Sequence, residues 1–412
     1  MRIDWWLTGL CLSRAMSQTV TMVYAAALPI LQREWEMSAA RAGTISSGYQ
    51  IGYAVSLLII STLADRMGAR RLYIGSVIGG AVFTTAFAFL ARGYLSAQIL
   101  YTLVALAIGG SYTTGLILIT EQYAPDRRGM ATGFYIASSS LGYVVSLALS
   151  GLTIPLGGYR LSFYVTCIAT IVGGALSWIT LAKTHETVAA RQKQQSFTKE
   201  VLKNRPAMLL ITAYTLHCWE LLGMWVWTPA FMTACLVQQG SGSLDAAGLG
   251  AYVTAGFHLA GLVASFSMGL LSDRVGRARV IMVLAGISTL CSLVFGWTIG
   301  LPFLLILAIG VVYSFTSLGD SPVLSAGLTE VVSASYLGSA FGLRSLFGFG
   351  AGAISPVVFG AVLDWTGPHG PGQPYDPSWG WAFVILGLPG FGAIWSVRSL
   401  QRLENKARVS PG

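Results

Sequence analysis

Long apolar runs constrain the fold of this chain more than any other feature of its sequence. An α-helix needs about 20 apolar residues to cross the hydrocarbon core of a bilayer. Twelve such runs can be marked, near residues 5–29, 43–63, 73–91, 96–119, 131–153, 161–182, 207–235, 248–271, 280–298, 302–327, 338–362 and 380–397. In hydrocarbon, only helices and closed barrels satisfy every backbone polar group. We therefore expect an all-α integral membrane protein with twelve transmembrane helices.

The charged residues are few, and most basic ones fall on one side of the expected membrane. Charged residues make up 10% of the chain, against roughly 25% in soluble domains. Nineteen of the 25 basic residues lie at the termini and in alternate loops: Arg2, Arg66, Arg70, Arg71, Arg127, Arg128, Lys183, Arg191, Lys193, Lys199, Lys203, Arg205, Arg274, Arg277, Arg279, Arg398, Arg402, Lys406 and Arg408. The positive-inside rule places these loops and both termini in the cytoplasm of a multi-pass protein of the cell (inner) membrane. The net charge of +9 thus reflects topology and requires no nucleic-acid partner.

A short charged loop occurs twice in the chain. Residues 63–72 read LADRMGARRL and residues 271–279 read LSDRVGRAR, which puts Asp65 and Asp273 208 residues apart. A second pair, Glu121 and Glu330, is 209 residues apart, and each glutamate is followed by a Gly-x-Ala-x-Gly sequence. Two motifs at nearly one offset indicate a tandem duplication, which is one way that membrane transporters are built. We expect two six-helix bundles, at 1–182 and 207–412, joined by a cytoplasmic linker at 183–206.

These motifs resemble the major facilitator superfamily, whose loop between helices 2 and 3 reads roughly G-x-L-x-D-R-x-G-R-R. Ser61 replaces the first glycine of that pattern, whereas the second copy has Gly269 there. The resemblance implies a secondary transporter that works by alternating access. It covers nearly the whole chain and says little about the substrate.

The resemblance also implies a set of cytoplasmic gate residues. In the family the loop acid caps the start of helix 11 and the arginines lock the gate, and a carboxylate is favourable at a helix N-terminus. Carried over, Asp65 faces the helix that begins near Gly338. The implied gate residues of this chain are Asp65, Arg66, Arg70, Glu121, Asp273, Arg274 and Glu330. Of these, Arg66 and Arg70 are expected to pair near Glu121, and Asp273 to lie near the helix start around Gly129, with Glu330 matching Glu121.

Six ionisable residues fall deep inside the apolar runs: Arg14, His217, Glu220, His258, Asp320 and Arg344. Charged groups at membrane depth are costly and usually face a cavity or a partner. Their positions along the runs, at about 1.5 Å per residue, bracket the bilayer midplane, where substrate sites of this architecture lie. A hydrogen-bonded structural role is the more common one for the two histidines.

Polar and aromatic neighbours extend this set. Gln18 and Thr21 lie four and seven residues after Arg14, on the same helical face. Tyr49 and Tyr53 are one turn apart in the second run, and Trp219 adjoins Glu220 in the seventh. We therefore expect a substrate site formed by Arg14, Gln18, Thr21, Tyr49, Tyr53, Trp219, Glu220, His258 and Arg344.

The acids at depth, Glu220 and Asp320, are the candidates for proton coupling. Asp320 and Arg344 are expected at heights that differ by roughly 6 Å, so that they can form an ion pair. The groups of small residues, such as Gly109 to Ser111 and Ser138 to Ser140, are assigned to helix packing alone.

The sequence carries no P-loop, no metal-ligand cluster and no G-x-S-x-G motif, so we expect neither an enzyme nor an ATP-driven pump, and no cofactor or metal. The five cysteines all fall in apolar runs, as packing residues. Two patterns of drug/proton exporters are missing: no arginine occurs between Arg92 and Glu121, and Gly142 is followed by Tyr143 rather than proline.

Two midmembrane arginines make the chain similar to the anion-carrying branches of the family, such as oxalate/formate, cyanate and nitrate carriers. The predicted function is secondary transport of a small, carboxylate-like anion by a monomer in a lipid bilayer. Proton-coupled efflux of amphipathic drugs or metabolites is the alternative, and a non-transporting sensor or scaffold is a further one. The coupling partner, a proton or a counter-transported anion, and the direction of transport stay open.

Overall fold

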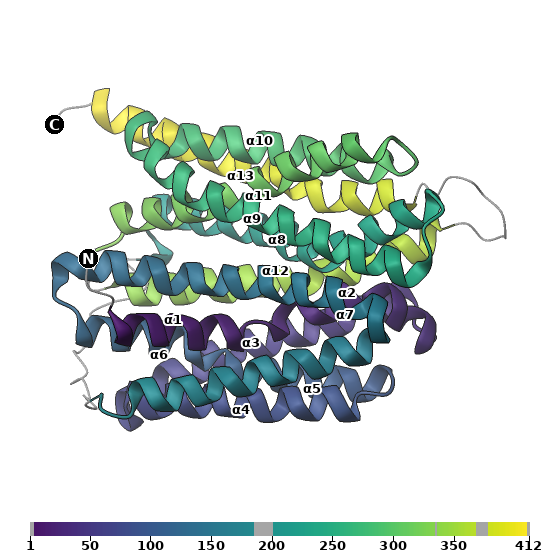
Figure 1. Cartoon of the computed structure of the whole chain (residues 1–412). Helices are drawn as coiled ribbons and strands as arrows, with labels where there is room; N and C mark the ends of the chain where they lie inside the picture. The colour runs from purple at the N-terminus through teal and green to yellow at the C-terminus, as the bar shows by residue number, and fades with distance from the viewer. Residues whose placement is uncertain (1–3, 185–200, 334–335, 368–377, 410–412) are drawn as a thin grey trace. The chain divides into compact units, whose positions relative to one another are not determined.

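The computed structural model describes residues 4–184, 201–333, 336–367 and 378–409 (Figure 1). Within these ranges a few side chains, including that of Asp65, also lie outside the description. The described residues form helices joined by short connections, with no strand among them. Nine helical segments of this part are long and apolar enough to cross a membrane. The all-α membrane fold is thus confirmed.

The elements follow the expected apolar runs in order. They are α1 (Trp5–Ser17), α2 (Val20–Glu34), α3 (Ala39–Met67), α4 (Ala69–Leu90), α5 (Tyr94–Ile108), α6 (Gly110–Gln122), α7 (Pro125–Leu181), α8 (Arg205–Gln238), α9 (Ser243–Val275), α10 (Arg277–Phe295), the 3₁₀ turn η2 (Gly296–Thr298), α11 (Phe303–Val331), α12 (Leu337–Thr366) and α13 (Ser378–Val409).

Four of the expected runs depart from the rule of one helix per run. The run 5–29 is divided between α1 and α2 at Gln18 and Thr19, and the run 96–119 is divided between α5 and α6 at Gly109. Conversely, α7 contains two runs and bends sharply between them at Gly157 and Gly158, where φ is 66° at Gly158. A glycine takes this left-handed value without the steric penalty of a side chain.

Compact packing divides the chain into two units, Met1–Arg191 with Thr228–Ala255, and Gln192–Trp227 with Gly256–Gly412. The first unit therefore contains a part of the second sequence half, and Gly248 packs against Pro155 of α7 inside it. The division of the chain at 182 and 207 remains a prediction.

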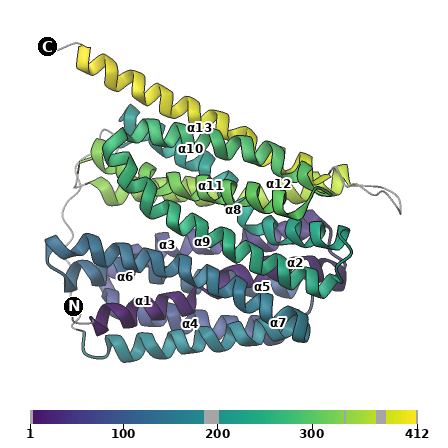
Figure 2. The same cartoon turned by 45° about the horizontal axis from the view of Figure 1, so that its top comes forward.

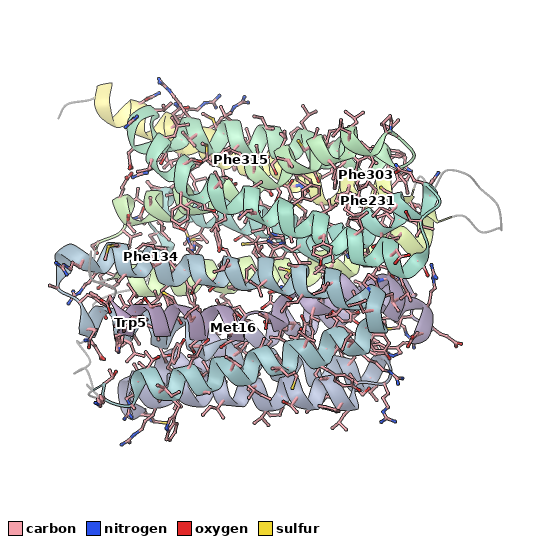
Figure 3. The ribbon with its side chains drawn as sticks, viewed as in Figure 1. Trp5, Met16, Phe134, Phe231, Phe303 and Phe315 are labelled. Carbon is pink, nitrogen blue, oxygen red and sulfur yellow. The ribbon has the colours of Figure 1, made fainter. Side chains whose placement is uncertain are left out.

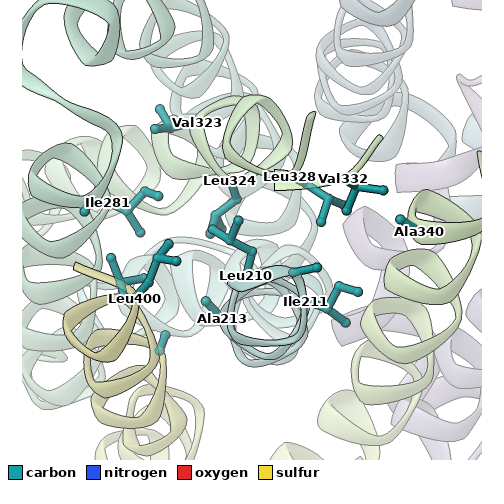
Figure 4. Close-up of a cluster of buried hydrophobic side chains, with 14 of the residues drawn as sticks. Leu210, Ile211, Ala213, Ile281, Val323, Leu324, Leu328, Val332, Ala340 and Leu400 are labelled. Carbon is teal, nitrogen blue, oxygen red and sulfur yellow. The ribbon is translucent and has the colours of Figure 1, made fainter. Parts of the chain in front are cut away.

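In the first unit α1 packs along α7, α3 along α5, and α4 against both α5 and α7 (Figure 2). In the second unit α10 packs between α11 and α13, and α12 contacts α13. An apolar cluster fills the space around the beginning of α8 in this unit, with Leu210 and Ile211 against Leu324 and Leu328 of α11 and Leu400 of α13 (Figure 4).

Large apolar side chains remain exposed on many helices. Trp5 is 74% exposed and Phe134 57% exposed, whereas Phe231 is fully buried (Figure 3). A soluble monomer rarely exposes contiguous apolar patches of more than a few hundred Å². Contact with lipid tails explains these exposed side chains.

The duplicated loop has one backbone geometry in both copies. Gly68 ends α3 with φ 85° and ψ 142°, and Gly276 ends α9 with φ 101° and ψ 137°. Each glycine N–H donates to the carbonyl four residues earlier, Ala64 in one copy and Ser272 in the other. Because only glycine adopts this region readily, the repeated Asp-Arg-x-Gly sequence encodes the turn between two helices.

Candidate functional site

Arg14 is the most deeply buried charge of the first unit, with 1% of its surface exposed. Its guanidinium donates from Nε to Ser139 Oγ at 2.9 Å, from Nη2 to the Tyr53 hydroxyl at 3.0 Å, and from Nη1 to Ser111 Oγ. All three partners are neutral hydroxyl groups. Among the described residues no carboxylate forms an ion pair with Arg14.

Aromatic rings complete the surroundings of this guanidinium. Its Cζ lies 5.6 Å from the ring centroids of Tyr112 and of Tyr135, within the range of cation–π attraction. The Tyr135 hydroxyl donates to the Ser111 carbonyl at 2.6 Å, and Ser111 Oγ also reaches the Ile108 carbonyl. The arginine is thus held by groups that are themselves fixed.

Two helix breaks bring these groups together. Gly109, between α5 and α6, lies so close to α3 that a Cβ there would be 3.0 Å from the Tyr53 carbonyl oxygen. This close approach places Ser111, at the beginning of α6, beside the guanidinium. The break between α1 and α2, at Gln18 and Thr19, lies about one helical turn after Arg14. The Tyr101 hydroxyl donates to the carbonyls of Val20 and Thr21, where α2 begins, at 3.1 and 2.8 Å.

A second polar group lies along the same face of the broken helix. Thr21 Oγ1 is 2.9 Å from the Tyr49 hydroxyl and 3.3 Å from Gln18 Oε1. The Tyr49 and Tyr53 rings stack with centroids 6.5 Å apart. The structure therefore connects Arg14, Tyr53, Tyr49, Thr21 and Gln18. Sequence spacing predicts neighbours within each of the two runs, whereas the contacts of Tyr53 with Arg14 and of Tyr49 with Thr21 join different helices.

Ser111 and Ser139 are the residues of this site that the sequence analysis missed. Both belong to groups of small residues that were assigned to packing alone. The sequence of a small-residue group does not distinguish a serine that only packs from one that accepts a hydrogen bond. The buried arginine on another helix is the one indication that these serines have a polar role.

In the second unit the buried ionisable groups pair differently from the prediction. Asp320 Oδ1 lies 2.9 Å from His217 Nδ1, and both residues are more than nine-tenths buried. Glu220, one turn after His217, accepts a hydrogen bond from Ser288 Oγ of α10 at 2.9 Å. The predicted ion pair between Asp320 and Arg344 is wrong, because His217 occupies that position beside Asp320.

Arg344 instead lies between aromatic rings. Its Cζ is 4.0 Å from the Tyr214 ring centroid and 4.7 Å from that of Phe341, and Nη1 donates to Ser325 Oγ at 2.6 Å. Unlike Arg14 it is only partly buried. The Arg344 guanidinium is thus held mainly by cation–π contacts with the two rings.

The remaining two predicted substrate contacts have clear packing partners. Trp219 Nε1 donates to the Ile385 carbonyl of α13 at 3.1 Å. The His258 ring lies 5.2 Å from the ring of Trp225, and 3% of the residue is exposed. Their roles as substrate contacts stay predictions.

The gate residues of the first copy do not pair as the resemblance implies. Arg70 donates to the carbonyls of Leu181 and Ala182, at 2.7 and 3.2 Å, and so the predicted pairing of Arg70 with Glu121 is wrong. Carbonyls at a helix C-terminus attract a cation in this way. Arg66 and Glu121 are exposed. The Asp65 side chain lies outside the described residues.

In the second copy the arginine that pairs is Arg277. It contacts Asp273 Oδ1 at 2.6 Å and Glu330 Oε1 at 3.0 Å, and it donates to Ser272 Oγ at 2.5 Å. Arg274, the arginine that the motif favours, is exposed and forms no ion pair in the described part of the chain. Within this unit, Asp273 and Glu330 therefore pair with Arg277 and not with Arg274.

Comparison with known proteins agrees with this architecture. The family model of the Major Facilitator Superfamily matches residues 10–239 and again residues 229–411. The chain is 26% identical to the gallate transporter of Pseudomonas putida over 410 residues, which cover 90% of this chain and 85% of that one. It is 24% identical to the gentisate transporter of Corynebacterium glutamicum over 362 residues, or 84% and 78% of the two chains.

Among solved structures, the chain resembles a bacterial homologue of the human lysosomal transporter Spinster, crystallised in an inward-facing and unoccupied conformation. The TM-score is 0.79 at 17% sequence identity, over the full length of both chains. At this identity the likeness concerns the fold. The family model and the fold give one answer: the chain belongs to the Major Facilitator Superfamily of membrane transporters.

Proposed function

We propose that this protein moves a small organic anion by alternating access and that it recognises the carboxylate of that anion. The observation that carries the proposal is Arg14, a fully buried cation whose described partners are all neutral. A buried charge is costly unless it is paired. An anionic substrate supplies the missing opposite charge.

The chemistry of the site favours a carboxylate on an aromatic body. The guanidinium fork matches the two oxygens of a carboxylate, which the point charge of lysine does not. The rings of Tyr49, Tyr53 and Tyr112 offer apolar surface beside the charge. Gallate and gentisate, which name the two relatives, are both aromatic carboxylates, so we extend that substrate class to this chain.

The other predicted substrate contacts fall into two groups, one beside Arg14 and one in the second unit. Tyr53 binds Arg14 directly, and Tyr49, Thr21 and Gln18 follow from it in a chain of contacts, so we propose these four residues as the polar wall of the site. Trp219, Glu220, His258 and Arg344 belong to the second unit, and we propose them as further substrate contacts.

We further propose that the protein is a monomer of the cell (inner) membrane with both termini in the cytoplasm, as the nineteen basic residues suggest. Its two halves divide at 182 and 207. The two Asp-Arg-x-Gly loops form the cytoplasmic gate, with Arg277 in place of Arg274. A proton is the proposed coupling partner, with Glu220 and Asp320 as the candidate acids.

Ligand binding to the purified protein tests the substrate class. A ligand that binds only the folded state raises the apparent stability. We expect gentisate, gallate and benzoate to raise the melting temperature, while the neutral analogue benzamide does not. We also expect proteoliposomes that contain the protein to take up labelled gentisate. A shift with the lipophilic cation tetraphenylphosphonium, and none with the three anions, would instead favour the drug-efflux function.

A further inference from the structure

The second unit contains a pair of buried titratable groups that substrate recognition does not require. His217 Nδ1 of α8 and Asp320 Oδ1 of α11 are 2.9 Å apart, and only 6% and 4% of the two residues are exposed. The other ring nitrogen, His217 Nε2, is buried and has no hydrogen-bond partner in the described part of the chain. That nitrogen is therefore available to take up and release a proton.

Tyr214, Cys218 and Glu220 on α8 lie beside this pair. The other titratable groups of this core are Cys291 on α10 and Tyr313 on α11, which adjoin Glu220, Arg344 on α12, which adjoins Tyr214, and His258 on α9, which adjoins Trp225. Two of them are already engaged, because Ser288 donates to Glu220 and the aromatic rings of Tyr214 and Phe341 surround Arg344. In the pair, by contrast, the His217 Nε2 atom has no hydrogen-bond partner in the described part of the chain.

The charges of the two cores differ by sign. In the described part of the first unit, the deeply buried charge is the cation Arg14. In the second unit Glu220 and Asp320 are buried acids, and Arg344 is a partly buried cation. With neutral histidines and both acids ionised, the first core carries one positive charge and the second core one net negative charge.

A monovalent anion on Arg14 cancels the charge of the first core. One proton on the His217–Asp320 pair cancels that of the second, because the pair changes from neutral imidazole and carboxylate to imidazolium and carboxylate, or to imidazole and carboxylic acid. Since net charge is costly at membrane depth, the carrier with both ligands bound is the one that crosses most easily between its states.

We propose that His217 and Asp320 together bind the coupling proton and that one proton moves with each monovalent anion, so that transport is electroneutral symport. The proton comes from water on one side and is released to water on the other, with no bond formed or broken elsewhere. The inference rests on the proposed anion transport and adds the proton site and the stoichiometry.

Gradient-clamped proteoliposomes test the stoichiometry, with labelled gentisate as the probe. For electroneutral one-to-one symport, one pH unit should accumulate gentisate about tenfold, because a tenfold concentration ratio balances a tenfold proton ratio. A membrane potential at equal pH should cause no accumulation. Accumulation driven by the potential alone would overturn the proposed stoichiometry.

Variants test the site. We expect Asp320→Asn to abolish accumulation driven by the pH gradient while leaving gentisate counterflow, which needs no net proton movement, within about twofold of wild type, because asparagine keeps the second core neutral without a proton. His217→Gln should abolish the accumulation as well. Asp245→Asn, in an exposed acid at the beginning of α9, is the matched control and should accumulate normally. Counterflow also shows that a variant is folded.

Three outcomes separate the proposals. If His217→Gln still accumulates gentisate with the pH gradient, the pair is not the proton site, whatever the substrate. If only Glu220→Gln loses accumulation, the proton belongs on Glu220. If the wild-type protein neither exchanges nor accumulates gentisate or gallate, the proposed anion transport itself fails, and the coupling inference fails with it.

Discussion

In the first unit the buried charge is a cation, Arg14, fixed by neutral hydroxyl groups, whereas in the second unit acids are buried beside a histidine and a serine. Gly68 and Gly276 form the same turn, one in each unit and 208 residues apart in the sequence. The two units thus share the geometry of this turn, whereas the buried polar residues of their cores differ.

The helices around the two centres also differ. The first and fourth apolar runs are broken at Gln18–Thr19 and at Gly109, close to the guanidinium, whereas α8 and α11, their counterparts after the repeat offset, are continuous. Discontinuous helices are typical of substrate sites in transporters. The broken helices agree with the ligand site that we propose in the first unit, and the buried acids agree with the proton site that we propose in the second.

The largest expected effect comes from breaking the histidine–aspartate pair. His217→Leu leaves Asp320 buried without its partner and should lower the unfolding free energy by about 3–5 kcal/mol. Arg14→Met strands no carboxylate and should cost clearly less. Unfolding in detergent measures both, and the double change His217→Leu with Asp320→Leu should restore much of the loss. Equal costs for His217→Leu and Arg14→Met would remove the contrast between the units.

The next effect concerns affinity. Arg14→Lys keeps the charge but loses the fork geometry, and we expect gentisate binding to weaken about ten- to a hundredfold, as for the loss of a charge-assisted hydrogen bond worth roughly 1.5–3 kcal/mol. Arg344→Lys should weaken it less, because that guanidinium is stacked between rings. Arg92→Lys, at an exposed loop position, is the control for titration calorimetry. Unchanged affinity in Arg14→Lys would contradict the carboxylate site.

The repeat itself can be tested by one substitution in each copy. Gly68→Ala and Gly276→Ala force a side chain into a region that is essentially restricted to glycine, and each should cost about 1–3 kcal/mol of stability. Gly75→Ala and Gly286→Ala lie in α4 and α10 with nothing within 4 Å of the added carbon, and should be neutral or stabilising by up to about 1 kcal/mol. A large cost in one copy alone would show that the two turns are not equivalent.

The smallest expected effect is a difference between the two Asp-Arg-x-Gly loops in how far salt changes the stability cost of an arginine substitution. Arg277→Ala removes contacts with Asp273 and Glu330, whose side chains are more than half exposed, and should cost at most about 1 kcal/mol. That cost should shrink in 1 M salt, where the Debye length is about 3 Å. Arg70→Ala removes hydrogen bonds to two carbonyls and should depend less on salt. Melting curves of both variants at two salt concentrations measure this difference. An equal salt dependence would contradict the assignment of ion pairs to Arg277 and of carbonyl hydrogen bonds to Arg70.

The sequence by itself determined the membrane-spanning helical class, the repeat and the glycine turns, because these follow from local composition and backbone geometry. Runs of about 20 apolar residues require helices, and the glycine of each Asp-Arg-x-Gly loop adopts φ values that other residues avoid. The linkage of Gln18 and Thr21 to Arg14 was also predictable, since helical spacing puts them on one face.

Only the tertiary structure decided which groups meet across helices. Height along the membrane suggested Asp320 with Arg344, yet Asp320 contacts His217, and Arg70 binds the carbonyls of Leu181 and Ala182 rather than Glu121. Ser111 and Ser139 became partners of Arg14 through close approach at Gly109 and through the fold of α7. Sequence spacing fixes the depth and face of a residue within its own helix. The rotation and packing of the neighbouring helices, which depend on many side chains at once, select its partner.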